Sequence, residues 1–244
     1  MRRRKMKKQL IYTATITLLS TSILGGILVN ADEQGDGASS TAKITFTGGN
    51  TDPNDPVDPD QPDHHVDPSD DVDPDDPDNH GTGDNGPLSI DYVSNITFGT
   101  KEIATCSQVY HAVNATPHVQ ITDKRGVEGG WTLTAAASKF TASDQSELKG
   151  AVLSFKNGDA RTSSDNISAK PEVNNAIVFD NAEAKPVMTA TSLAGQGTWV
   201  DVFEGDEGNN ANVQLAVPAG SAQAKEYTAT ITWTLTAGPT SADE

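Results

Sequence analysis

Few residues of this sequence could carry out nucleophilic chemistry. Cys106 is the sole cysteine, and His111 follows five positions later, so the two could be pictured as a thiol and its base. Residues five apart in a predicted strand point to opposite faces, which separates these two side chains. The chain also has no GxSxG, HExxH, P-loop or CxxC motif. We therefore expect a buried or idle thiol, and we predict that the protein is not an enzyme.

Aspartate is abundant, so calcium is the metal to consider. The stretch DPDDPDNHG, residues 73–81, places prolines where an EF-hand loop needs ligands, and it lacks the glutamate of the twelfth position. A second acidic loop, EGDEGNN from Glu204 to Asn210, has no fixed ligand spacing. We interpret both as sites of diffuse counterion binding. The prediction is that there is no cofactor and no dedicated metal site, with bound calcium left open.

Two stretches of the chain share the tetrad WTLT, one starting at Trp131 and the other at Trp233. From Tyr227 to Thr236, apolar residues alternate with threonines, which predicts a β-strand. Leu133 and Leu235 then share a face with the tryptophan of their own tetrad. Apolar residues alternating with Thr favour a core face, although exposed indoles could also stack on sugar rings.

Two strands with the same tetrad could be neighbours in one sheet, with Trp beside Trp. The third tryptophan, Trp199, stands between Gly197 and the VDVF stretch. Aromatic residues close to turns are often exposed, so Trp199 is our candidate for an exposed aromatic contact.

Segments with a β pattern extend from Leu88 to Ala237. They are SIDYVSNITFG, HVQITDKRG, GGWTLTAA, GAVLSFKNG, NAIVFD, GTWVDVF, NVQLAVPAG and the final strand, KEYTATITWTLTAGP. Glycines and an Asn-Gly pair separate them at spacings that suit a sandwich or barrel. A weak helical signal is confined to SKFTASDQSELKG, residues 138–150. We predict an all-β fold, with a single β-sandwich or barrel-like domain over residues 87–244.

Residues 1–31 have the pattern of a signal peptide. Six basic residues precede an apolar run from Leu10 to Val29, and Val29, Asn30 and Ala31 resemble a cleavage site. An uncleaved membrane anchor is the alternative, because the run is nearly long enough to span a membrane. After Leu235 only nine polar or small residues follow, so we expect noncovalent retention at the surface and no membrane contact after cleavage.

Charge excludes nucleic acid as a partner. Of 17 Lys and Arg residues, six fall in the leader, which leaves 11 against 34 acidic residues and a formal charge of −23. A protein that binds a polyanion needs a basic footprint, and none is present.

An Asp/Pro-rich segment precedes the predicted domain. Residues 50–86 contain 13 aspartates and almost nothing apolar, which predicts a disordered linker. Before it lies a short N-terminal segment, residues 32–49, in which Ile44 and Phe46 alternate with polar neighbours as in a strand. A lone strand is unstable, so residues 43–47 either fray or pair with the domain.

Taken together, these stretches resemble the WxL-domain surface proteins of low-GC Gram-positive bacteria. The resemblance rests on GGWTLTA at 129–135 and YTATITWTLTAGP at 227–239. It is supported by the leader, ITFTGG before an Asp-Pro segment, GPLSIDYVSNITFG, HVQITDKRG and VPAGSAQAKEYTATITW. It covers essentially the whole chain and implies that Trp131, Leu133, Trp233 and Leu235 are the family's motif residues.

The resemblance implies a secreted protein of the cell wall and cell surface. Its function would be noncovalent binding of peptidoglycan or an associated wall polymer, often beside other surface proteins that include WxL-interacting partners. The alternative is a structural subunit of a multi-protein cell-surface complex or adhesin assembly. An enzyme acting on wall glycans would need two positioned carboxylates, and no such pair stands out.

Overall fold

The computed structural model describes residues 40–66 and 76–238. The described residues form twelve β-strands and no helix, which confirms the all-β prediction. None of them forms a helix that could cross a membrane. The predicted leader, residues 1–31, lies outside the described residues.

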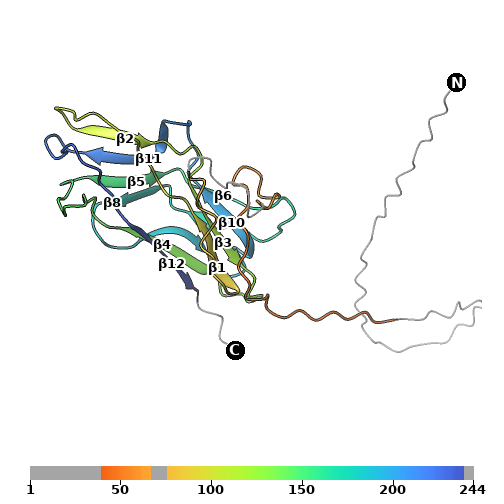
Figure 1. Ribbon diagram of the computed structural model, residues 1–244. Coiled ribbons are helices and arrows are strands. Elements are labelled where there is room, and N and C mark those ends of the chain that lie inside the picture. The colour runs from red at the N-terminus through yellow and green to blue at the C-terminus, as the bar shows by residue number, and fades with distance from the viewer. Residues whose placement is uncertain (1–39, 67–75, 239–244) are drawn as a thin grey trace, which may run out of the picture. The chain divides into compact units, whose positions relative to one another are not determined.

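The strands form three antiparallel four-stranded sheets (Figure 1), here named after β3, β11 and β4. The β3 sheet has the order β1 (Leu88–Val93), β3 (His118–Asp123), β10 (Gly197–Val202) and β6 (Asp159–Arg161). The β11 sheet has the order β2 (Gln108–Ala112), β11 (Asn210–Val217), β5 (Val152–Lys156) and β8 (Ala176–Phe179). The β4 sheet has the order β12 (Ile231–Ala237), β4 (Trp131–Ala137), β9 (Lys185–Ala190) and β7 (Glu172–Val173).

One hydrophobic core is shared by all three sheets. Ile121 comes from the β3 sheet, Phe155 from the β11 sheet, and Trp131 and Leu133 from the β4 sheet. The period-2 alternation of these strands places every second side chain inside. The ring of Phe155 lies 5.5 Å from that of Phe179 in the same sheet. It lies 5.0 Å from that of Phe203, which directly follows β10, so aromatic packing joins the β11 sheet to the β3 sheet.

All eight predicted strand segments contain a strand, but two details differ. The final strand begins at Ile231 and not at Lys225. Upstream of it the chain stays extended and pairs irregularly, with reciprocal backbone hydrogen bonds between Thr228 and Thr141. The stretch 138–150 forms no helix, because the amide of Ala142 donates to the carbonyl of Ser146 and closes a tight turn.

The Asp/Pro segment departs from its prediction as a disordered linker. Its described parts, residues 50–66 and 76–86, lie against the β3 sheet, whereas residues 67–75 lie outside the described residues. We call residues 50–66 the strap. Val57 is 2 % exposed and packs on Val200 and Val202, on the sheet face that points away from the core. The folded unit therefore starts well before Pro87, and the predicted boundary at that residue needs correction.

Hydrogen bonds explain why so polar a segment is ordered. The side chain of Gln120 accepts from the Val57 amide at 2.8 Å and donates to the Asp55 carbonyl at 3.1 Å. Asn54 donates to the carboxylate of Asp91 at 3.0 Å. Buried backbone groups need such partners. Polar side chains of the β3 sheet thus hydrogen-bond to the strap, and Val57 adds an apolar contact.

Two cations hold the strap, one near its start and one at its middle. Lys124 donates to the side chain of Asn50 at 2.8 Å and to that of Asn54 at 2.9 Å. Arg161 on β6 donates to the carbonyl of Pro59 at 3.1 Å and to the carboxylate of Asp60 at 3.0 Å. Prolines in the segment reduce the conformational entropy lost on ordering.

Upstream of the strap, residues 43–47 form no strand. Ile44 is 75 % exposed and Phe46 is 83 % exposed. The sequence left open whether this segment frays or pairs with the domain, and the described residues show no pairing.

Two buried titratable groups lie on opposite faces of the β3 sheet. Asp201 on β10 is fully buried, and neither carboxylate oxygen has a hydrogen-bond partner among the described residues. Burial raises the pKa of Asp201 to about 7, and the nearby charge of Asp159 adds to the effect. The backbone of Gly158 comes so close that a Cβ there would meet Oδ1 of Asp201 at 2.5 Å.

His118 on β3 lies on the strap side of the sheet. Its ring stacks on Tyr92 with centroids 4.6 Å apart, and Nδ1 lies 2.9 Å from the carbonyl of Thr116. Burial lowers the pKa of His118 to about 4, although the Thr116 carbonyl and the charges of Asp58 and Asp60 act in the opposite direction.

Candidate functional site

The two WxL stretches are antiparallel neighbours in one sheet, as the repeated tetrad suggested. Each tetrad extends to a pentad, WTLTA, and Leu133 lies opposite Leu235 in the register of β4 and β12. Trp131 faces Ala237, and Trp233 faces Ala135. The tryptophans are therefore not side by side, because the antiparallel register places each indole across from an alanine. This pairing of a large residue with a small one lets both indoles lie on the same sheet face.

The first motif lies in the core. Trp131 and Leu133 are both 0 % exposed, and the indole N–H of Trp131 donates to the carbonyl of Gly195 at 3.0 Å. Gly195 has φ of 69° and lies so close that an added Cβ would meet Nε1 of Trp131 at 2.9 Å. A glycine is needed there for both reasons. The first motif thus supports the fold and offers no ring to a ligand.

The second motif has a different environment. β12 is an edge strand of its sheet, and Trp233 and Leu235 are half-buried. The Trp233 ring stacks on Phe155 with centroids 6.3 Å apart and an interplanar angle of 23°. Phe155 belongs to the core. One side of the Trp233 indole is thereby fixed on the core, while part of the side chain stays accessible.

A groove of about 1310 Å³ lies beside β12, and Trp233 is one of its lining residues. Its lining consists of segments 93–103 and 222–231 together with Tyr110, Phe140, Leu148, Leu153, Leu215, Val217 and Trp233. We call this feature the groove. Its volume exceeds the roughly 300–1,000 Å³ of most small-molecule sites. A ligand that filled it would be an oligomer or a segment of a polymer.

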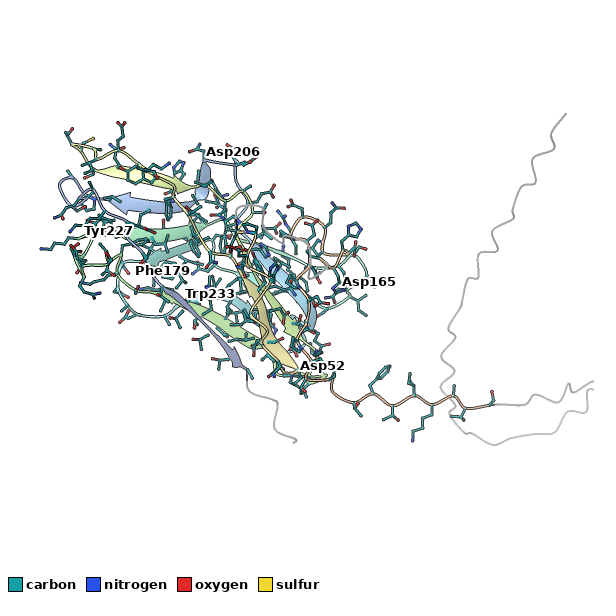
Figure 2. All side chains as sticks on the ribbon, viewed as in Figure 1. Asp52, Asp165, Phe179, Asp206, Tyr227 and Trp233 are labelled. Atoms are coloured by element: carbon teal, nitrogen blue, oxygen red, sulfur yellow. The ribbon has the colours of Figure 1, made fainter. Side chains whose placement is uncertain are left out.

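Aromatic residues gather in the groove. The lining contains Phe98, Tyr110, Phe140, Tyr227 and Trp233, which are five of the 13 aromatic residues of the chain. All five are half-buried, so each keeps some ring surface in solvent. Two of these residues, Tyr227 and Trp233, are labelled in Figure 2, where they lie at separate positions. The groove can therefore offer several apolar platforms to one extended ligand.

The wall formed by residues 222–231 is tied to the neighbouring loop. Lys225 donates to the carboxylate of Asp144 at 2.7 Å and to the hydroxyl of Ser146 at 3.0 Å. These hydrogen bonds from Lys225 and Ser146 lower the pKa of Asp144 below its usual range. The amide of Gln223 donates to the hydroxyl of Tyr227 at 3.2 Å. The wall is thus held in place before any ligand arrives.

The groove has no net formal charge. Its charged lining residues are Lys101, Glu102, Lys225 and Glu226, two of each sign. Lys124 and Arg125, two basic residues that are adjacent in the sequence, are both engaged elsewhere. Lys124 holds the strap, and Arg125 pairs with Asp123 at 2.8 Å. The described part of the domain therefore presents no free basic cluster at these two residues.

The remaining residues predicted from the sequence do not form a site. Trp199 is only 3 % exposed and donates from its indole N–H to the carbonyl of Gln196 at 2.9 Å, so its prediction as an exposed contact is wrong. Cys106 is exposed and accepts from Gln108, while His111 lies 2.9 Å from Asn209. Within residues 40–66 and 76–238, no group of three His, Cys, Asp or Glu residues could hold a metal ion.

Sequence reasoning missed most of the groove. Phe98 and Tyr110 come from segments far from β12 in the chain, and their only signal was their aromatic type. Tyr227 was predicted as part of the final strand, on the same face as Trp233. That shared face was the one available signal that both residues border one surface.

Comparison with known proteins identifies the family of this chain. The profile described as "WxL domain surface cell wall-binding" matches residues 33–239, which include the strap, the groove and both pentads. No curated protein matches the chain, and no solved structure does. The match covers most of the sequence, and the chain therefore belongs to the WxL family of surface cell wall-binding domains.

Proposed function

We propose that this cell-surface protein attaches to the wall by binding peptidoglycan noncovalently, with the groove as the contact surface and without catalysis. The observation that carries the proposal is the position of the second motif. Trp233 borders a large groove that has aromatic lining and no net charge. Binding would then rest on short-range apolar and hydrogen-bonding contacts and not on ionic attraction.

The charge of the whole domain supports an uncharged binding surface. Residues 87–244 contain 18 acidic and 10 basic residues, and 10 − 18 gives a formal charge of −8. Anionic wall polymers such as teichoic acids would be repelled by such a domain. Peptidoglycan contains a glycan chain with neutral rings, which avoids this repulsion.

Sedimentation with purified peptidoglycan tests the proposal. The chain without its predicted leader should pellet with peptidoglycan equally well before and after wall teichoic acid is removed. Tyr110 and Val109 are neighbours on β2, but only Tyr110 lines the groove, while Val109 is 53 % exposed. Tyr110→Ser should weaken sedimentation, and Val109→Ser should leave it unchanged. Sedimentation that required teichoic acid, or no sedimentation at all, would refute the proposal.

A second function is favoured by one observation. Ile44 and Phe46 are exposed on residues 43–47, which form no strand among the described residues. Such a segment could add to a sheet edge of another surface protein and make the chain a structural subunit of a multi-protein complex. A pull-down with wall-free surface proteins tests this idea: Ile44→Ser together with Phe46→Ser should abolish capture while wall sedimentation persists.

A further inference from the structure

The wall of the groove next to β12 has a free backbone position. Thr228 exchanges hydrogen bonds with Thr141, and the carbonyl of Thr230 accepts from the Ser138 amide at 2.8 Å. In an extended chain, consecutive residues direct their N–H and C=O groups to opposite edges. The N–H and C=O of Ala229 therefore point away from the segment 138–141, and they bond to no described residue. Ala229 lines the groove.

Aromatic side chains flank this free position. Tyr227, Ala229, Ile231 and Trp233 alternate with threonines, and all four line the groove. At about 3.3 Å per residue, the distance from Tyr227 to Trp233 is on the order of 20 Å in an extended chain. That length accommodates several sugar rings. The wall thus combines two ring platforms with a donor and an acceptor between them.

We infer that the groove binds the glycan backbone of the wall, through rings that carry N-acetyl groups, and not the peptides attached to it. This inference rests on the proposed function, since it assigns a ligand to the same groove. An acetamido group has one N–H and one C=O, which complement the free C=O and N–H of Ala229. The C–H faces of a sugar ring carry small positive charges and pack on the negative faces of Tyr227 and Trp233.

The stem peptides fit this surface less well. They carry carboxylates and amines, which would lose water against the apolar part of the groove formed by Ile96, Phe98, Leu153 and Leu215. The charged lining residues lie outside this part, at positions 101–102 and 225–226. Of the two lysines in the lining, Lys225 is already paired with Asp144. Burial of an unpaired charge is costly, so a neutral polymer is the better occupant.

Calorimetric titration with soluble oligomers tests the inference. The leaderless chain should bind an oligomer of N-acetylglucosamine, and about tenfold less tightly an oligomer of glucose, which has the same linkage but no acetamido groups. Ala229→Pro removes the backbone N–H and should abolish this preference, whereas Ala229→Ser keeps the N–H and should retain it. Tyr227→Leu should weaken binding about tenfold. Tyr227→Phe keeps the ring but loses the hydroxyl that accepts from Gln223, so it should weaken binding less than Tyr227→Leu does. Thermal unfolding of each variant shows whether the fold is intact.

Other results would overturn the inference. They are tight binding of a free stem peptide, equal binding of both sugar oligomers, or folded Ala229→Pro and Tyr227→Leu variants that bind the sugar as the parent does. If whole peptidoglycan still sediments the parent in these cases, the proposed function survives and only the assignment to the glycan fails. If the parent does not sediment, the proposed function itself fails.

Discussion

Replacement of Asp201 by Asn should change the pH dependence of stability more than any other single substitution in the core. The carboxyl has a pKa of about 7 in the folded domain and 3.8 as its ordinary value. Between these two pH values the folded state binds more protons than the unfolded state. Stability from this group is therefore fully present below about pH 4 and is lost as pH rises toward 7.

The size of the effect follows from the shift. Each pKa unit corresponds to about 1.4 kcal/mol, so a shift from 3.8 to about 7 is worth about 4 kcal/mol. The free energy of unfolding of the parent should fall by this amount relative to that of Asp201→Asn between about pH 4 and pH 8. Above the folded pKa the difference should level off, since both states are then ionised.

His118 acts in the opposite direction. Its pKa is lowered to about 4 from 6.5, so its contribution to stability is gained as pH rises through that range and is worth about 3 kcal/mol. The parent should consequently show a nearly flat profile from about pH 4 to 6.5. His118 is present in both proteins, so it cancels in their difference, which isolates Asp201.

Urea unfolding followed by circular dichroism gives the required free energies across this pH range. The difference between parent and Asp201→Asn is the quantity to plot, since the amide has its own buried donors and its absolute stability is not diagnostic. Val202→Ala, a neighbour on β10 that does not titrate, is the matched control and should shift the profile without changing its shape. Parallel profiles for parent and Asp201→Asn would refute the argument that burial raises the pKa.

Three further predictions follow from the motifs, the strap and the charge. Trp131→Ala should lower the free energy of unfolding by about 3–5 kcal/mol, and Trp233→Ala by clearly less, because Trp131 is fully buried and Trp233 only half-buried. Urea titration measures both losses. Equal losses would contradict the different burial of the two tryptophans. Deletion of residues 50–66 should lower the free energy of unfolding by about 3 kcal/mol, because the buried contacts of the strap are lost. Limited proteolysis of the parent should leave a fragment that begins before Asn50. A fragment beginning at Leu88 would show that the strap is detached. Wall sedimentation should persist or improve as the Debye length falls from ~30 Å at 0.01 M salt to ~8 Å at 0.15 M, whereas a steep loss would indicate a basic contact surface.

The strands with one buried face were predictable from sequence. In β4 and β12, apolar residues alternate with Thr, and the shared WTLT tetrad suggested that the two strands could be neighbours, which they are. Period-2 patterns work in such strands because only one face contacts the core. The register remained open, since the same sequences would also allow Trp beside Trp.

Trp199 shows why the position of a turn was a poor guide to exposure. It lies on β10, which pairs with β3 on one side and β6 on the other. Its side chain points to the sheet face that packs in the shared core, and the residues that cover it there come from strands distant in sequence. Composition near Gly197 carried no information about them.

The leader pattern, the acidic charge, the strand segments and the paired motifs were determined by the sequence itself, since each depends on residue type or local spacing. The strap and the groove were decided only by the tertiary structure. The strap is ordered because Gln120 and Arg161, far from it in the chain, satisfy its backbone. Phe98, Tyr110 and Trp233 border one groove because three distant segments converge there. Long-range contacts of this kind leave no local pattern in the sequence, so only the folded structure reveals them.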